Sequence, residues 1–236
     1  MLVRTYCERP TVTLMFQRFL SLAMLCVWFA LWCAATPLQA ATDTPQNYQQ
    51  ARKALKDPDP ERRTQAMGRL LQLGKARDAR WVYPLLGDSE LSVRQVALAT
   101  VWQLWGRSGD AAIDRLYQQG IEAMNARELA EAQDIFSKII AKRPQFAEGW
   151  NKRATVYYMT GQYALSMKDC EEVLKRIPQH FGALVGYAQM LADQGSPERA
   201  LELMERAIKV NPYVSNAEFM MEELRQQIEN KRKNAA

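Results

Sequence analysis

The chain has 236 residues and a formal net charge of +5 at pH 7, a mild basic excess in a length that suits one or two domains. Its one dense basic run, Lys231-Arg232-Lys233, lies at the C-terminal end. A solvated tail is expected there, and a nucleic-acid partner is not. His180 is the only histidine, which leaves little scope for catalysis or metal binding built on histidine.

The N-terminal segment has the parts of a secretory signal. Arg18 precedes an apolar run, Phe19 to Ala35, and a small residue, Ala40, offers a cleavage site. We therefore expect residues 1–40 to be a signal peptide, with Met15 as an alternative start. The other interpretation is an uncleaved helix that anchors the protein in the inner membrane, although the run is slightly short for a span of about 20 residues.

The mature chain would be an exported protein, periplasmic in a Gram-negative source, that begins with a polar leader over residues 41–46. Removal of residues 1–40 leaves Cys170 as the last cysteine, so no internal disulfide can form. Cys170 occupies an apolar helical position, which favours a buried, inert thiol. One cysteine and one histidine cannot build a zinc site, and we expect neither a metal nor a cofactor.

Residues 47–107 contain a pattern that recurs after 31 residues. Ala66, Leu70 and Leu73 lie on one face of a predicted helix, which starts at Asp59-Pro60 and stops near a glycine. The recurring residues are Asp57, Arg63, Ala66, Leu70 and Leu73, repeated as Asp88, Arg94, Ala97, Val101 and Leu104. The segment resembles HEAT repeats, with its second copy the better match. The resemblance implies stacked helical pairs.

Three prolines set the frame of the next part, because Pro144, Pro178 and Pro212 are spaced 34 residues apart. A proline at that period ends the second helix of a repeated helical pair. Each proline follows small, aromatic or leucine residues at offsets that match the repeat: Gly120, Ala132 and Phe136; Trp150, Ala154 and Tyr157; Ala188, Leu191 and Ala200. Residues 113–212 resemble three tetratricopeptide repeats, with units at 113–146, 147–180 and 181–214.

Two further features complete the predicted fold. Arg127 stands where the turn glycine of the first unit belongs, whereas Gly161 and Gly195 hold that place in the other two units. Residues 215–236 predict a capping helix and a basic tail, and Ser215 with Glu218 has the spacing of a capping box. The predicted fold class is all-α: an α-solenoid of stacked antiparallel helix pairs, HEAT-like and then tetratricopeptide, closed by a C-terminal helix.

The resemblance to tetratricopeptide repeats implies a binding surface, because the first helix of each unit lines a concave groove in that family. Aromatic and amide side chains there could hold an extended or helical peptide. Glu148 falls on the same helical face. The alternative is that this face is ordinary tolerated surface. The candidate partner-binding residues are Tyr117, Ile121, Met124, Asn151, Thr155, Tyr158, Val185 and Gln189.

The sequence offers no catalytic constellation. His180 follows Pro178 in a predicted loop, where a surface or packing role is expected, and no glycine-rich phosphate loop is present. We therefore expect a non-catalytic adaptor or assembly factor of the cell envelope that binds another protein or a peptide segment, without nucleic acid or metal. The alternative is the soluble arm of a membrane complex. A hydrolase would need a cluster that we do not find.

Overall fold

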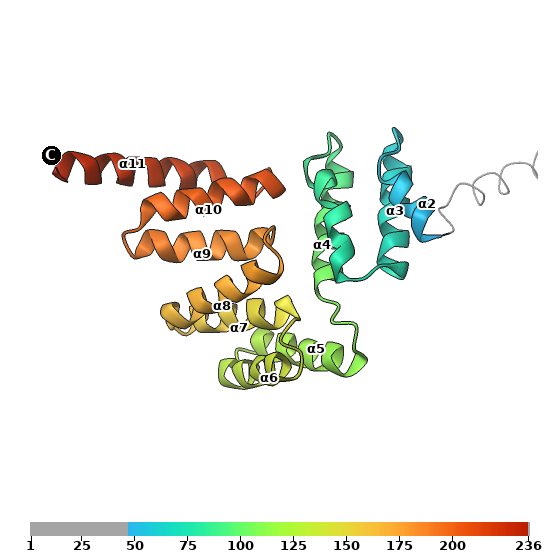
Figure 1. Ribbon diagram of the computed structural model, residues 1–236, viewed down its shortest axis with the longest axis horizontal. Coiled ribbons are helices and arrows are strands. Elements are labelled where there is room, and N and C mark those ends of the chain that lie inside the picture. Colours follow the sequence, from blue (N-terminus) through green and yellow to red (C-terminus); the bar gives the residue numbers. More distant parts are fainter. Residues whose placement is uncertain (1–46, 236) are drawn as a thin grey trace, which may run out of the picture. The chain divides into compact units, whose positions relative to one another are not determined.

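The structure is a computed structural model that describes residues 47–235, all within the second of two compact units, Pro45–Ala236. The predicted signal peptide, polar leader and anchor lie outside the described residues. Within residues 47–235 every regular element is a helix, so the all-α prediction is confirmed. Figure 1 shows these helices in chain order.

The N-terminal helices are three α-helices and two 3₁₀ helices. They are α2 (Tyr48–Ala54), α3 (Pro60–Leu73), η1 (Ala76–Trp81), η2 (Tyr83–Gly87) and α4 (Leu91–Trp105). The Asp59 side chain caps α3 by accepting from the backbone N–H of Glu61, and Gly74 follows its last turn, as predicted. The chain between α3 and α4 forms two short 3₁₀ helices where a paired helix was expected.

The 31-residue repeat has matching geometry in its two copies. Nη1 of Arg63 donates to the carbonyl oxygens of Asp57 at 2.8 Å and of the following residue at 3.0 Å. Nη1 of Arg94 repeats this with Asp88 at 2.7 Å and its successor at 2.9 Å. Nη2 of Arg63 also reaches Oδ1 of Asp88 at 2.8 Å. Each arginine therefore fixes the turn before its own helix, and Arg63 joins the two copies.

The repeat units follow as three antiparallel helical pairs and a closing helix. The helices are α5 (Ala111–Asn125), α6 (Leu129–Lys142), α7 (Ala147–Met159), α8 (Tyr163–Arg176), α9 (Phe181–Asp193), α10 (Pro197–Val210) and α11 (Ala217–Ala235). Each helix packs on the next in the chain, and Figure 1 shows α7 to α11 side by side. Pro144, Pro178 and Pro212 each follow the second helix of a pair.

Small residues at the helical seams explain the close approach of these pairs. A Cβ atom at Gly120 would lie 2.6 Å from the ring of Phe136, so only glycine fits there. Gly161 and Gly195 have φ angles of +73° and +71°, and Arg127 adopts the same left-handed turn at +64°. The first unit therefore keeps the turn geometry at some cost, because an L side chain disfavours this conformation.

The N-terminal helices meet the repeats from the side. Trp105 of α4 stacks on His180, which caps α9, with ring centroids 4.1 Å apart and planes at 16°. Trp102 contacts the ring of Phe181 edge-on at 5.3 Å. Arg94 lies over the ring of Tyr213, beyond α10, at 4.3 Å. The N-terminal helices therefore cover the turns between repeat units, rather than preceding α5 in line.

The start of α11 differs from the predicted capping box. The first helical hydrogen bond runs from the N–H of Met220 to the carbonyl of Asn216, whose φ is +58°. Ser215 thus lies one residue too early to cap the helix. The apolar stripe of α11 is as expected, because Ala217, Met221 and Leu224 are buried in the same core cluster as α10.

Candidate functional site

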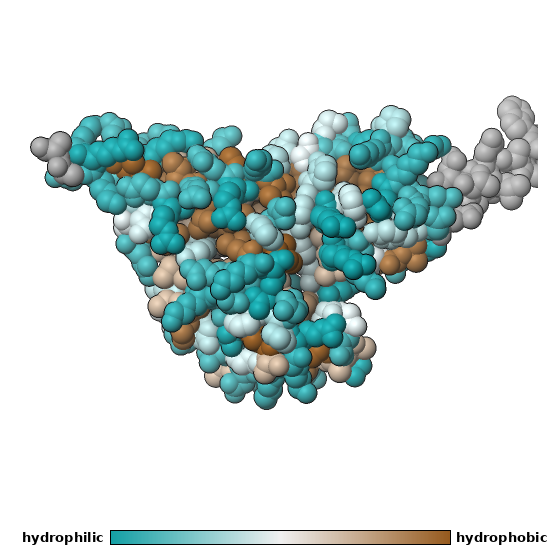
Figure 2. Space-filling model, in the orientation of Figure 1, coloured by the Kyte–Doolittle hydropathy of each residue, from teal (hydrophilic) through white to brown (hydrophobic). Residues whose placement is uncertain are grey.

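A groove of about 320 Å³ is formed by α7, α8, α9 and α11. Figure 2 shows hydrophobic side chains exposed among hydrophilic ones over the region of α9. The groove has a largely apolar floor and a polar rim. Its lining residues are Asn151, Ala154, Thr155, Tyr158, Ser166, Cys170, Gly182, Ala183, Val185, Gly186, Gln189, Met190 and Met220.

The predicted binding residues of the second and third units converge on this groove. Asn151, Thr155 and Tyr158 are spaced four and three residues apart, which places them on one face of α7. Val185 and Gln189 are spaced four residues apart, which places them on one face of α9. The Tyr158 side chain is 44% exposed, so its ring is free to contact a ligand.

The predicted residues of the first unit lie elsewhere. Ile121 and Met124 are partly buried against the core around Phe136. Tyr117 packs in the same core, and its hydroxyl donates to Oε2 of Glu148 at 3.1 Å. Burial raises the pKa of Tyr117 well above its ordinary value, and the charge and hydrogen bond of Glu148 add to the effect. Tyr117 therefore supports the stack from within.

The floor of the groove is open because its helices carry small residues. A Cβ atom at Gly186 would meet no atom within 4 Å, so the surface of α9 is bare there. Ser166 stands in the place of the usual alanine and donates from Oγ to the carbonyl of Ala154 at 2.7 Å. Met220 of α11 completes the wall. The sequence analysis missed Met220, and the apolar stripe of α11 was the signal that could have indicated it.

A buried cluster of hydrogen-bonded side chains, which we call the hub, lies beside the groove and joins the first helices of the three repeat units. Its members are Tyr117, Glu148, Asn151 and His180. Oε1 of Glu148 lies 2.7 Å from Nε2 of His180, and both side chains are almost fully buried. Oε2 of Glu148 accepts from Tyr117 and from the amide of Asn151, each at 3.1 Å. Nδ1 of His180 accepts the backbone N–H of Ala183 at 3.0 Å. The expectation that Glu148 faces the groove is therefore wrong, and His180 has its packing role.

The electrostatics of the hub favour an ionised carboxylate. Burial acts to raise the pKa of Glu148, but its interaction with His180, above all the hydrogen bond, outweighs burial, helped by Lys152 and Asn151. The pKa of Glu148 is consequently held below its ordinary value. The hub thus fixes the first turns of α7 and α9, the two helices that carry most of the groove.

The groove holds no activated nucleophile. Cys170 is buried, and burial raises the pKa of its thiol to about 12, with smaller contributions from the charges of Asp169 and Glu171. A thiolate is therefore absent at neutral pH. Within residues 47–235, no three His, Cys, Asp or Glu side chains gather closely enough to hold a metal ion. In the same range no helix is sufficiently long and apolar to span a bilayer.

Comparison with known proteins supports the repeat assignment. A family model described as "Tetratricopeptide repeat" matches residues 117–181 and 170–215. A TPR repeat-containing protein of Rhizobium etli is 39% identical over 108 residues, which is 46% of this chain and 53% of that protein. The chain thus spans about half the length of this curated relative. Residues 117–215 are tetratricopeptide repeats, and the HEAT resemblance of residues 47–107 stays a prediction.

Two solved tetratricopeptide domains match parts of this chain at low sequence identity. The first TPR of Spaghetti (RPAP3), solved with an HSP90 peptide, is 18% identical with a TM-score of 0.47, covering 49% of this chain and 92% of that one. The Sgt2 TPR domain from Aspergillus fumigatus is 21% identical with a TM-score of 0.49, covering 54% of this chain and 85% of that one.

Proposed function

We propose that this protein is a non-catalytic adaptor or assembly factor that binds a peptide segment of another protein in the groove of α7, α9 and α11. The observation that carries the proposal is the convergence of Asn151, Thr155, Tyr158, Val185 and Gln189 on one groove. Their aromatic, amide and aliphatic side chains surround a bare glycine surface, an arrangement that leaves room for a backbone to approach.

The chemistry of the groove fits a short peptide. Met220 offers adaptable apolar contact, and the amide of Gln189 can donate to and accept from a peptide backbone. A groove of about 320 Å³ takes only a few side chains. Because ordering the peptide offsets much of the contact energy, we expect modest affinity, with a Kd on the order of micromolar.

Binding is favoured over catalysis by the state of the two reactive residues. The pKa of the Cys170 thiol is raised to about 12, and both ring nitrogens of His180 already have partners. A nucleophile needs a base within hydrogen-bond reach and a lowered pKa, and this pair offers neither feature.

We place the protein in the cell envelope on the strength of the signal-like segment at residues 1–40. An exported, periplasmic chain starting at Ala41 is the first form of the proposal. An arm anchored by the uncleaved helix at residues 19–35 is the second. The mass of the chain isolated from its host separates the two forms, because only cleavage removes residues 1–40.

The test of the groove uses a substitution that fills it without removing a contact. Gly186→Leu projects into open space within the groove, and Gly68→Leu does so on the exposed side of α3, away from the groove. Peptides selected by display on the wild-type protein would be titrated against both variants by fluorescence anisotropy. This choice avoids Asn151→Ala, which would also disturb the hub at Glu148.

We expect Gly186→Leu to weaken the selected peptides at least about tenfold, and Gly68→Leu to leave their affinity within about twofold. Thermal unfolding of both variants controls for folding. Selected peptides that bind Gly186→Leu as tightly as the wild type would remove the groove as the binding site.

A further inference from the structure

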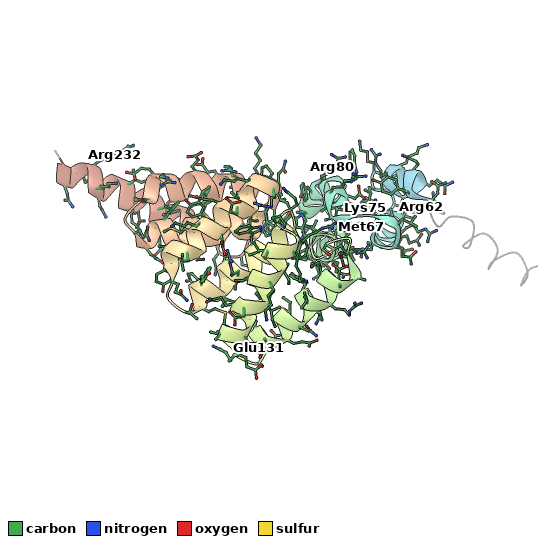
Figure 3. The ribbon with its side chains drawn as sticks, turned by 60° about the horizontal axis from the view of Figure 1, so that its bottom comes forward. Arg62, Met67, Lys75, Arg80, Glu131 and Arg232 are labelled. Carbon is green, nitrogen blue, oxygen red and sulfur yellow. The ribbon has the colours of Figure 1, made fainter. Side chains whose placement is uncertain are left out.

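A second hollow, of about 410 Å³, lies between the N-terminal helices and the turns of the repeats. Five arginines line it, and no carboxylate does. We call it the arginine cleft and define it by Arg77 and Arg80 of η1, Arg107 after α4, Arg143 after α6, and Arg176 at the end of α8. Figure 3 labels Arg80, close to the boundary between the N-terminal helices and the repeats.

The positive charge continues beyond this hollow. An adjoining hollow shares Arg80, Tyr83, Pro178 and Gln179 with the arginine cleft and adds two cations of α10. These cations are Arg206 and Lys209, and no carboxylate lines this hollow either. The two hollows together form a basic track along the turn between the first and second repeat units and the turn between the second and third.

Most of this charge is not neutralised by the protein. Among the five arginines of the cleft, only Arg176 has a carboxylate at ion-pair distance in the described structure, namely Glu172 at 2.7 Å. Arg107 and Arg143 donate to the carbonyl oxygens of Gly74 and Ser108, which carry no net charge, and Arg143 also acts through space on the carboxylate of Asp110. Arg77 and Arg80 are exposed. Like charges thus face one another across the cleft, an arrangement that an anionic ligand would relieve.

Helix dipoles account for only part of the cluster. Arg143 and Arg176 lie at the C-terminal ends of α6 and α8, where a cation is favourable in any protein. Arg77 and Arg80 belong to a short 3₁₀ helix and lie opposite those ends. Because Arg143 and Arg176 already interact with the dipoles of α6 and α8, the charges of Arg77 and Arg80 add electrostatic repulsion at this place.

We propose that the arginine cleft binds an acidic peptide segment, through its carboxylate or phosphate groups. A guanidinium matches either oxyanion with two parallel hydrogen bonds. Gln145 and Gln179, 34 residues apart at equivalent places in two units, line the same cleft and can pair with a peptide backbone. The site is separate from the groove of α7, α9 and α11.

A peptide fits better than a nucleic acid. Single-stranded nucleic acids are held by exposed aromatic rings that stack on the bases. In the cleft, the rings of Trp105 and Phe146 are only 1% and 5% exposed, and the ring of Tyr83 is half-buried. The exposed groups of the cleft are mainly guanidinium and amide, which recognise acidic side chains and a peptide backbone.

The test titrates a fluorescein-labelled peptide of alternating Glu and Gly, and its Gln-for-Glu counterpart, by anisotropy. The full protein is compared with Arg77→Glu/Arg80→Glu and with the charge-matched control Lys138→Glu/Lys168→Glu, whose lysines are exposed outside both hollows. We expect at least about tenfold weaker binding for the arginine variant and a change within about twofold for the control. The Gln peptide should not bind measurably.

Further arms identify the ligand chemistry and control for folding. The comparison of the Glu and Gln peptides uses the wild-type protein, so it holds even if Arg77→Glu/Arg80→Glu disturbs folding. A further variant, Arg77→Lys/Arg80→Lys, keeps the charge but loses the paired hydrogen bonds, so it should bind the Glu peptide more weakly than the wild type does. If the arginine variant and the lysine control lose the same affinity for the Glu peptide, binding follows net charge and the cleft is not a defined site. Tighter binding of a thymidine oligonucleotide, or of vesicles rich in anionic lipid, would overturn the acidic peptide as ligand. Gly186→Leu should leave this binding unchanged, which separates it from the groove.

Discussion

Removal of the Glu148 carboxylate tests whether the buried hub holds the repeats together. Glu148→Ala leaves Nε2 of fully buried His180 without its partner at 2.7 Å and also removes the acceptor of Tyr117 and Asn151. Breaking one side of a buried pair typically costs about 3–5 kcal/mol. The two further hydrogen bonds fall within the same range, because their losses are not additive with the first.

That cost corresponds to a large change in melting temperature. For a chain of this size each kcal/mol shifts Tm by about 2–4 °C, so Glu148→Ala should lower it by about 6–20 °C. Urea denaturation followed by far-UV circular dichroism gives the free energy of unfolding. Tryptophan fluorescence is followed in the same titration, and Trp105, which stacks on His180, contributes to that signal.

The matched control is Glu205→Ala on α10, an exposed glutamate away from the helix ends. We expect it to change the free energy of unfolding by less than about 0.5 kcal/mol. If Glu148→Ala comes within about 1 kcal/mol of this control, the hub does not support the stack, and the account of His180 as its centre is wrong.

Three other predictions follow from the same geometry. Because the folded pKa of Glu148 is below its ordinary value of 4.5, its stabilisation is full above that value and is lost as pH falls through the folded pKa; urea denaturation between about pH 5 and 3 should therefore show a larger loss for wild type than for Glu148→Gln. Arg127→Gly relieves a left-handed φ of +64° and should raise the free energy of unfolding, measured by urea denaturation, by up to about 1 kcal/mol; a loss of stability would contradict this account of the turn. Gly182→Ala places a Cβ 2.7 Å from Trp102 and should cost about 1–3 kcal/mol, whereas Gly186→Ala, with open space around it, should stabilise by about 0.4–1 kcal/mol; equal melting temperatures for the two would contradict the packing described.

Local patterns were enough to predict the repeat units. Gly120 allows the close contact with Phe136, and prolines at a fixed period mark where each second helix ends. The pairing of helices within a unit therefore follows from residues that are near one another in the sequence. The groove residues Thr155 and Gln189 followed from the resemblance to tetratricopeptide repeats, whose first helices line the groove. The Ser215 box failed because Asn216 takes a left-handed φ that the residue pattern does not specify.

The junction could not be predicted because it depends on contacts between distant segments. Nothing near His180 in the sequence indicates that Trp105 stacks on it or that Glu148 bonds to it. The same contacts explain the misplaced groove residues. Tyr117 and Glu148 lie on the helical face expected to line the groove. Their side chains are nevertheless buried, because the Glu148 carboxylate bonds to the buried His180 and the Tyr117 hydroxyl bonds to that carboxylate.

The stacking of Trp105 on His180 also bears on how the array unfolds. In an ordinary linear array the terminal units come and go nearly independently, since each touches only its neighbours. Here α4 rests on the cap of α9, and His180 connects through Glu148 to Tyr117 of the first unit. Fraying at one end therefore withdraws support from the other, and the described helices should melt as a single cooperative block. A cooperative block of this kind keeps the groove of α7, α9 and α11 preformed, so the proposed binding of a peptide there would cost little free energy for ordering the groove.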